Sequence, residues 1–208
     1  MTRRQMMMNG AAIAALLTVA SVTVLSVPAE SGEPLFDDDR ILGDAEAPIT
    51  IIEYSSLTCP HCADLHAGAL PEIKKTWIAE GKARLVYRHF PLDGLALRAA
   101  MVTNCMDEQR YFTFLEALFH GQKLWSRAND PVKALSQVAA LAGLSGERFE
   151  ACIADEAEAN AILERRQHGE TTYGIGSTPT FIVNGRKVEG ALGYEAFNKV
   201  LEDAESRS

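Results

Sequence analysis

The stretch TCPHC, residues 58–62, follows directly on an apolar run at residues 49–54. This run is rich in β-branched residues and predicts a short buried strand. Pro60 suits the first position of a helix, where its missing N–H is no loss. The sequence therefore predicts that Cys59 and Cys62 lie where a buried strand gives way to a helix.

Two cysteines at this spacing fit three kinds of site. Zinc would draw on Cys59, Cys62 and a nearby histidine, yet structural zinc needs four ligands, and the chain has no second CxxC and no HxxxH. We therefore expect no metal. An inert disulfide within the motif would close too small a loop to constrain the unfolded chain much. The third kind of site, a redox-active dithiol, is favoured.

The redox-active interpretation depends on how the start of a helix stabilises a thiolate. Unpaired N–H groups and the positive end of the helix dipole stabilise a negative sulfur on Cys59. His61 is close enough to add a hydrogen bond or, when protonated, a charge. Cys62, about one turn further in, is expected to be the more buried, resolving thiol.

The length and net charge of the chain limit its domain number and exclude several classes of function. The 208 residues suffice for one globular domain, with or without an insertion, and a 47% hydrophobic content is enough to form its core. The formal net charge of −8 argues against a broad attraction to nucleic acid or to an anionic bilayer. No Walker-type or GxGxxG phosphate loop is present, so we expect no cofactor.

Residues 1–29 are typical of an export segment. Arg3 and Arg4 supply a basic start, residues 5–29 carry no charge, and residues 27–29 offer a cleavage site before Glu30. We favour a cleaved signal peptide over an N-terminal membrane anchor, although the uncharged run is long enough for either. Export predicts a periplasmic location, where disulfides persist.

The rest of the chain divides by its patterning. Residues 30–47 are predicted to form a flexible lead-in. Residues 48–94 contain the first strand, a helix from Cys59 to about Glu80 that bends near Gly68 and Pro71, and a second strand at 83–89. Residues 95–172 show helical spacing throughout, and residues 173–208 hold a hairpin and a closing helix. The predicted fold is α/β, a sheet domain with a helical insertion.

The hairpin is the strongest local signal in the second part. Strands at 180–183 and 186–189 are joined by Asn184-Gly185, a pair typical of two-residue turns. Pro179 directly precedes the first of these strands. A cis Thr178–Pro179 bond would expose the preceding backbone to an extended peptide, whereas a trans turn proline would not. The residues alone leave both forms open.

Together, these motifs in this order resemble the DsbA family of thioredoxin-fold thiol-disulfide oxidoreductases. The resemblance covers about residues 35–205 and implies a thioredoxin-like sheet with flanking helices and an inserted all-helical subdomain. It also implies that Cys59 is the nucleophile, that Cys62 resolves mixed disulfides and that His61 tunes the pair.

The same resemblance assigns roles away from the motif. Pro179 is similar to the family's cis-proline beside the active site, with Thr178 offering its backbone to a bound peptide. Glu53 matches a buried acid that assists proton transfer beneath the dithiol. The alternative for Glu53 is an edge-strand carboxylate in water, which fits its otherwise apolar strand less well.

Two further cysteines, Cys105 and Cys152, are similar to those of a subgroup with a second disulfide in the helical domain. The TCPHC pair is too close in sequence to staple a large loop, which also favours this pairing. The bond would close a loop of about 46 residues and stabilise the fold by roughly 3–4 kcal/mol. The alternative is two buried free thiols.

The predicted function is an exported oxidoreductase that donates its Cys59–Cys62 disulfide to reduced, unfolded exported proteins. The family implies reoxidation by a quinone-linked membrane partner of the DsbB type, and we expect a monomer without a nucleic-acid partner. Thr178 replaces the valine of the best-known oxidases, so an isomerase or reductase remains an alternative. The short lead-in, however, leaves no room for the dimerisation domain of the well-known isomerases.

A redox-silent peptide-binding module is the alternative from another class. We assign no function to His66, His89, His120 or His168. His66 falls one turn beyond Cys62, where it would either border the active site or lie on a solvated face of the helix that begins at Cys59, and we favour the solvated position.

Overall fold

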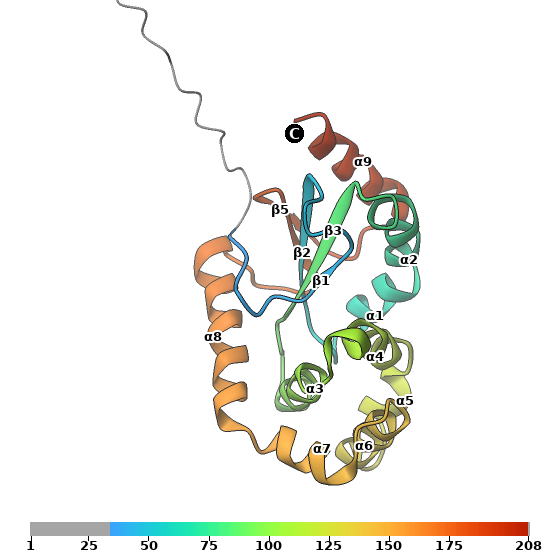
Figure 1. Cartoon of the computed structure of the whole chain (residues 1–208), viewed down its shortest axis with the longest axis vertical. Coiled ribbons are helices and arrows are strands. Elements are labelled where there is room, and N and C mark those ends of the chain that lie inside the picture. Colours follow the sequence, from blue (N-terminus) through green and yellow to red (C-terminus); the bar gives the residue numbers. More distant parts are fainter. Residues whose placement is uncertain (1–33, 208) are drawn as a thin grey trace, which may run out of the picture. The chain divides into compact units, whose positions relative to one another are not determined.

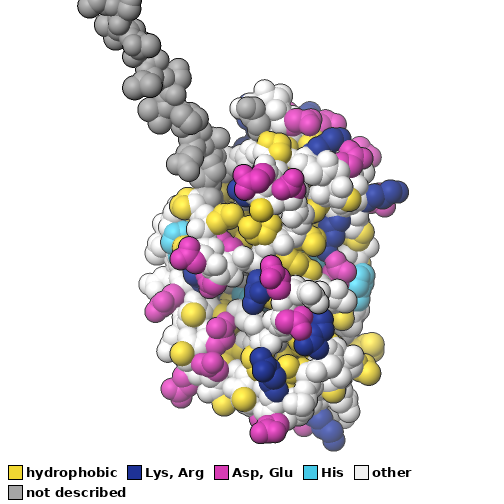
Figure 2. Space-filling view, in the orientation of Figure 1, with side chains coloured by type: hydrophobic (Ala, Val, Ile, Leu, Met, Phe, Trp, Pro, Cys, Tyr) yellow, Lys and Arg dark blue, Asp and Glu magenta, His cyan; other side chains and the backbone are white. Residues whose placement is uncertain are grey.

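The computed structural model describes residues 34–207 (Figure 1). The predicted export segment, residues 1–29, lies outside the described residues. Within residues 34–207, no helix combines the length and the apolar character needed to cross a membrane. On the face seen in Figure 2, acidic and basic side chains are interspersed rather than gathered into one large basic patch.

A mixed five-stranded sheet forms the centre of the described chain, in the order β1-β3-β2-β4-β5. β2 and β3 run parallel, and the other neighbouring strands pair antiparallel. The strands are β1 (Ile41–Leu42), β2 (Ile49–Ser55), β3 (Ala83–His89), β4 (Thr180–Val183) and β5 (Arg186–Glu189). The α/β fold class is therefore confirmed.

β2 is the central strand, and every residue in it is buried. Its burial on both faces explains its apolar, β-branched sequence. Ile52 pairs with Val86 on one side and with Ile182 on the other, so segments on either side of the helical region meet in one sheet. The hairpin turn has positive φ at Asn184 (44°) and at Gly185 (81°), as the Asn-Gly pair predicts.

The predicted flexible lead-in differs from expectation over residues 38–42. β1 adds an antiparallel edge to β3, and the Asp39 carboxylate pairs with the buried Arg88 at 2.7 Å. A two-residue strand has too little pattern to be found in the sequence, because its partner lies more than 40 residues away.

The helix after TCPHC is divided, as the bend predicted. α1 (Pro60–Ala67) ends at Gly68, whose φ of −110° and ψ of −92° break the helical path. α2 (Ala69–Ile73) follows and continues into the π-helical turn η1 (Lys74–Ile78). Gly81, with φ of 70°, then turns the chain into β3.

The helical region lies below the sheet in Figure 1, and α8 rises along one side of it. Its helices are α3 (Gly94–Asn104), α4 (Glu108–His120), α5 (Gln122–Ser126), α6 (Pro131–Leu141), α7 (Gly146–Ile153) and α8 (Glu156–Tyr173), and α9 (Tyr194–Glu205) closes the fold. Side chains of Asp93, Asp107, Asp130, Ser145 and Asp155 cap five of these helices. α8 approaches β2 so closely at Gly169 that a Cβ there would lie only 2.8 Å from the Tyr54 ring. Glycine is the residue that permits this approach.

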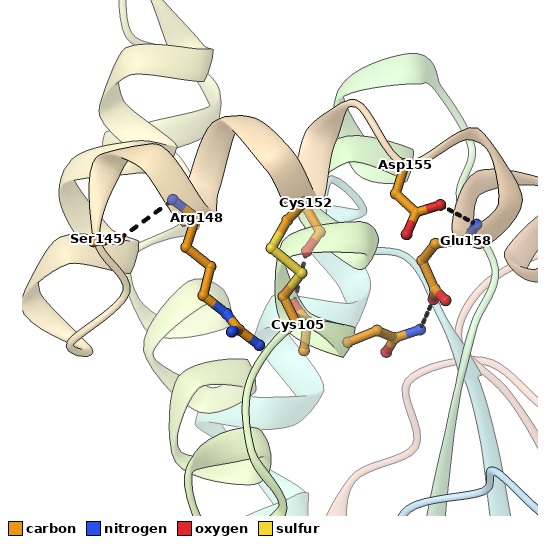
Figure 3. The surroundings of a disulfide bond; sticks show 9 residues. Cys105, Ser145, Arg148, Cys152, Asp155 and Glu158 are labelled. Atoms are coloured by element: carbon orange, nitrogen blue, oxygen red, sulfur yellow. Dashed lines mark hydrogen bonds between the residues drawn. A yellow bond between two sulfur atoms is a disulfide. The ribbon is translucent and has the colours of Figure 1, made fainter.

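A disulfide between Cys105 and Cys152 joins α3 to α7 (Figure 3). Cys105 is the C-cap residue of α3, and Cys152 lies in the last turn of α7. The two residues are 47 positions apart in the sequence. The predicted pairing in the helical region is thus confirmed, and the alternative of two free thiols is wrong.

Candidate active site

The dithiol lies at the junction that the sequence predicted. Cys59 is the N-cap of α1, with an extended backbone, and Pro60 takes the first helical position. The Gln122 side chain, from α5, donates hydrogen bonds of 2.9 Å to the carbonyl oxygens of both Leu57 and Cys59. The helical region therefore holds the loop that carries Cys59.

Cys59 and Cys62 are free thiols with very different acidities. The pKa of Cys59 is lowered to about 5, first by the hydrogen bond from the Cys62 thiol. Burial opposes this effect, while the Thr178 side chain and the N–H groups of Cys62 and His61 reinforce it. Burial, followed by the interaction with Cys59, raises the pKa of Cys62 far above its ordinary value. One thiol of the pair is therefore ionised at neutral pH and the other keeps its proton.

His61 contributes through its backbone. Its side chain is exposed, and its imidazole has no hydrogen-bond partner among residues 34–207. Its N–H group, by contrast, helps to lower the pKa of Cys59. The predicted influence on the thiolate is thus carried by the helix start rather than by a contact of the ring.

Thr178 and Pro179 lie beside the dithiol although they are distant in sequence. The Thr178–Pro179 peptide bond is cis, as the resemblance implied. Cys59 Sγ lies 3.4 Å from the Thr178 carbonyl oxygen, to which it donates when the thiol is protonated. β4 begins at Thr180 and pairs with β2, which brings this loop to the end of β2 from which α1 departs.

Glu53 is fully buried in β2, so the edge-strand alternative is wrong. Its Oε1 atom accepts a hydrogen bond from the Ser55 hydroxyl at 2.6 Å and lies 2.9 Å from His66 Nε2. Burial alone would raise the pKa of this carboxyl. The charge and hydrogen bond of His66, together with the Ser55 hydroxyl, outweigh burial, and the pKa of Glu53 falls below its usual value.

The prediction that His66 lies on a solvated helix face is wrong. The residue is only 3% exposed, and its ring stacks on Phe119 of α4 with centroids 3.8 Å apart. The physical reason is the i, i+4 spacing from Cys62, which places both side chains on one face of α1. That face packs against β2 and the helical region.

The sequence also indicates no role for Ser55 or Gln122, which lie just after the predicted strand at residues 49–54 and within the helical residues 95–172, respectively. The i, i+4 spacing of His66 from Cys62 is a sequence signal that could have placed His66 at the site. No sequence signal indicates that Gln122 binds Cys59, which is 63 positions away. In the described part of the chain, no three His, Cys, Asp or Glu side chains gather as metal ligands would.

Comparison with known proteins agrees with this geometry. The thioredoxin family model matches residues 36–203. The crystal structure of Wolbachia pipientis alpha-DsbA1 superposes with a TM-score of 0.78 and 32% identity, covering 83% of this chain and 94% of that one. Oxidised BdbD from Bacillus subtilis, at 21% identity, shares the fold with a TM-score of 0.72 over 84% of this chain and 97% of that one.

Curated relatives point to the same class. A candidate protein-disulfide oxidoreductase of Rickettsia bellii is 29% identical over 82% of this chain and 68% of its own length. One from Rickettsia prowazekii is 32% identical over 74% of this chain, which spans only 57% of that protein. The chain belongs to the thioredoxin family and, within it, to the DsbA-type thiol-disulfide oxidoreductases.

Proposed function

We propose that this protein is an exported oxidase that transfers its Cys59–Cys62 disulfide to reduced proteins. The observation that carries the proposal is the unequal acidity of the two thiols. A stabilised Cys59 thiolate favours the reduced form over the disulfide, and this makes the disulfide a better oxidant.

The reaction proceeds through two exchanges at one sulfur. A substrate thiolate attacks Cys59 Sγ, and the Cys59–Cys62 bond breaks with its electron pair passing to Cys62. A second substrate thiolate then attacks the substrate sulfur of the mixed disulfide and releases Cys59 as a thiolate. The substrate loses two electrons and the protein gains them. Reoxidation reverses the sequence, with Cys62 as the resolving thiol.

The residues around the dithiol bind the substrate, stabilise the thiolate and transfer the proton. In this proposal the Thr178 backbone pairs with the extended substrate, and Pro179 shapes the surface beside the sulfur. The N–H groups at the start of α1, including that of His61, hold the Cys59 thiolate. Glu53 supplies the proton that Cys62 takes up and later removes it.

The compartment and the partners follow from the same proposal. The Cys105–Cys152 disulfide is of a kind that persists in oxidising compartments, which supports the periplasm. The substrates would be reduced, unfolded exported proteins, and a DsbB-type membrane protein would reoxidise the dithiol. We propose a monomer, cleaved from a signal peptide at residue 29.

Thr178 is the observation that favours a second candidate, a disulfide isomerase or reductase. A threonine beside the cis-proline, where oxidases carry valine, is the feature expected of isomerases. The redox-silent peptide-binding module finds less support, because such a module has no use for a thiol whose pKa is lowered to about 5.

The test is catalysed oxidation of a reduced protein. The oxidised protein is mixed with reduced, unfolded ribonuclease A, and recovery of ribonuclease activity is followed over time. Wild type accelerates recovery, and Cys59→Ser does not, whereas Cys62→Ser accumulates a mixed disulfide through Cys59. Full activity in Cys59→Ser would disprove the proposal, and preferential activity on scrambled rather than reduced ribonuclease would support the isomerase.

A further inference from the structure

We infer that His66 is the positioning residue of a buried proton relay that runs from Cys62 through Ser55 to Glu53. His66 holds the Glu53 carboxylate ionised and oriented, so that Glu53 can take the Cys62 proton when Cys62 attacks. The inference rests on the proposed oxidoreductase function and adds to it a residue outside the TCPHC motif.

The hydrogen bonds of the structure cover the relay from Ser55 through Glu53 to His66. Ser55, at the end of β2, donates its hydroxyl proton to Glu53 Oε1 at 2.6 Å and acts on the buried Cys62 thiol beside it. The hydroxyl oxygen can therefore accept the Cys62 proton while it passes its own to Glu53. On the far side, His66 Nε2 lies 2.9 Å from the same Oε1 atom and donates to it.

Water cannot easily replace these groups. Cys62, Ser55 and Glu53 have no solvent exposure, and the stacked Phe119 ring covers His66. A thiol that must lose its proton in such a site needs an internal acceptor. Glu53 is the carboxyl that the described residues bring to this position.

Stability alone poorly explains the buried contact between Glu53 and His66. Glu53 Oε2 and His66 Nδ1 are buried without hydrogen-bond partners among the described residues. Unsatisfied atoms in a buried charged pair cost stability, and apolar residues of similar size would serve the core as well. A role in proton transfer accounts for an arrangement that packing does not require.

Several other ionisable groups face Glu53. Tyr87 of β3 and Tyr111 of α4 both interact with its charge, and both keep their protons because burial raises the pKa of each. Lys74 of η1 acts on Glu53 at longer range and is itself paired with Glu116. Cys62 is the remaining donor, and His66 is the one cation-forming side chain in direct contact among the described residues.

The resolving step balances as follows. Cys62 Sγ forms a bond to Cys59 Sγ, and the bond from Cys59 to the leaving sulfur breaks with its electron pair. The Cys62 proton passes to Ser55, and the Ser55 proton passes to Glu53. In the reverse direction, Glu53 returns this proton to Cys62 as substrate attacks the disulfide.

The reactions of Cys59 and Cys62 can be followed separately in one experiment, because they release product in two successive phases. The reduced protein is mixed rapidly with dithiobis(nitrobenzoate), which releases a first coloured thiolate when Cys59 attacks. A second coloured thiolate is released when Cys62 resolves the mixed disulfide. The first phase reports Cys59 and the second reports Cys62, in one trace and at each pH.

The matched variants are His66→Phe, His66→Gln and, as an exposed control, His120→Gln. Without His66, the effect of burial, which raises the pKa of the Glu53 carboxyl, loses its main opposing influence. His66→Phe should therefore slow the second phase by about 10-fold or more near pH 6 and less at higher pH. His66→Gln, which retains an N–H donor, should fall between His66→Phe and wild type, and His120→Gln should match wild type.

A merely structural role for His66 would not shift the pH midpoint of the second phase alone. An upward shift of that midpoint in His66→Phe, with an unchanged first phase, supports the inference. The same midpoint and rate as wild type would overturn it while leaving the proposed function intact. Loss of the first phase in wild type itself would instead overturn the proposed function.

Discussion

In its protonated form, the Cys59 thiol donates a hydrogen bond to the Thr178 carbonyl oxygen, with 3.4 Å between the sulfur and the oxygen. The two residues are 119 positions apart, and the whole helical region lies between them in sequence. They meet because β2 and β4 are neighbours in the sheet. A peptide that paired with the Thr178 backbone would therefore lie against the reactive sulfur.

The first prediction concerns pH. In the reduced folded protein the pKa of Cys59 is about 5, against an ordinary value of 9.0. A lowered folded-state pKa gives stability that is fully present above pH 9, the unfolded value, and is lost as pH falls toward 5. The free energy of unfolding of the reduced protein, measured by denaturant titration, should rise with pH across this window more steeply than that of Cys59→Ser. Parallel curves would contradict it.

The second prediction concerns Gln122, whose side chain is buried and satisfies two carbonyl oxygens of the active-site loop. Gln122→Leu keeps the volume but leaves both acceptors without this donor. We expect the free energy of unfolding to fall by about 1–3 kcal/mol in urea titrations. The exposed Gln167→Leu is the control and should change it by less than about 0.5 kcal/mol. Equal effects of the two substitutions would argue against the role of Gln122.

The third prediction compares two neighbouring aspartates. Asp39 pairs with Arg88 where both side chains are almost fully buried, whereas Asp38 pairs with Arg165 and is 70% exposed. Asp39→Ala removes the carboxylate from a buried guanidinium and should cost about 3 kcal/mol or more. Asp38→Ala should cost less than about 1 kcal/mol. Thermal or urea unfolding of both variants tests the difference, and similar losses would be inconsistent with an anchored residue 39.

The fourth prediction concerns the second disulfide. Cys105 and Cys152 are 47 positions apart, so the bond restricts a long loop in the unfolded chain. Replacing both with alanine should lower the free energy of unfolding by about 4 kcal/mol in the chain-entropy account. The oxidase assay should retain activity below the unfolding transition. An unchanged unfolding midpoint would show that this bond adds no stability.

The sequence predicted those parts of the fold that have strong local signals. The apolar pattern of residues 49–54 marked β2, Pro60 marked the start of α1, and the Asn184-Gly185 pair marked the hairpin. The order of these motifs led to the family, which in turn implied the cis Thr178–Pro179 bond. These signals are short-range, or belong to a motif order that a family preserves.

The missed features depend on contacts between distant segments. β1 exists because β3 offers it an edge, and His66 is buried because α4 covers that face of α1. The i, i+4 spacing places His66 on the same face of α1 as Cys62, but no local signal shows that α4 covers that face. The helical region is more than an insertion, because its Gln122 and Phe119 side chains contact Cys59 and His66 and help to bury the site.

The most direct test of the central claim is the equilibrium of the Cys59–Cys62 pair against a glutathione buffer. The fraction of reduced dithiol is measured across ratios of reduced to oxidised glutathione at neutral pH, with Cys59→Ser as the blank. The stabilised Cys59 thiolate predicts an oxidising pair, which becomes reduced even when oxidised glutathione is in excess. A pair that stays oxidised until reduced glutathione is in large excess would contradict the oxidase function.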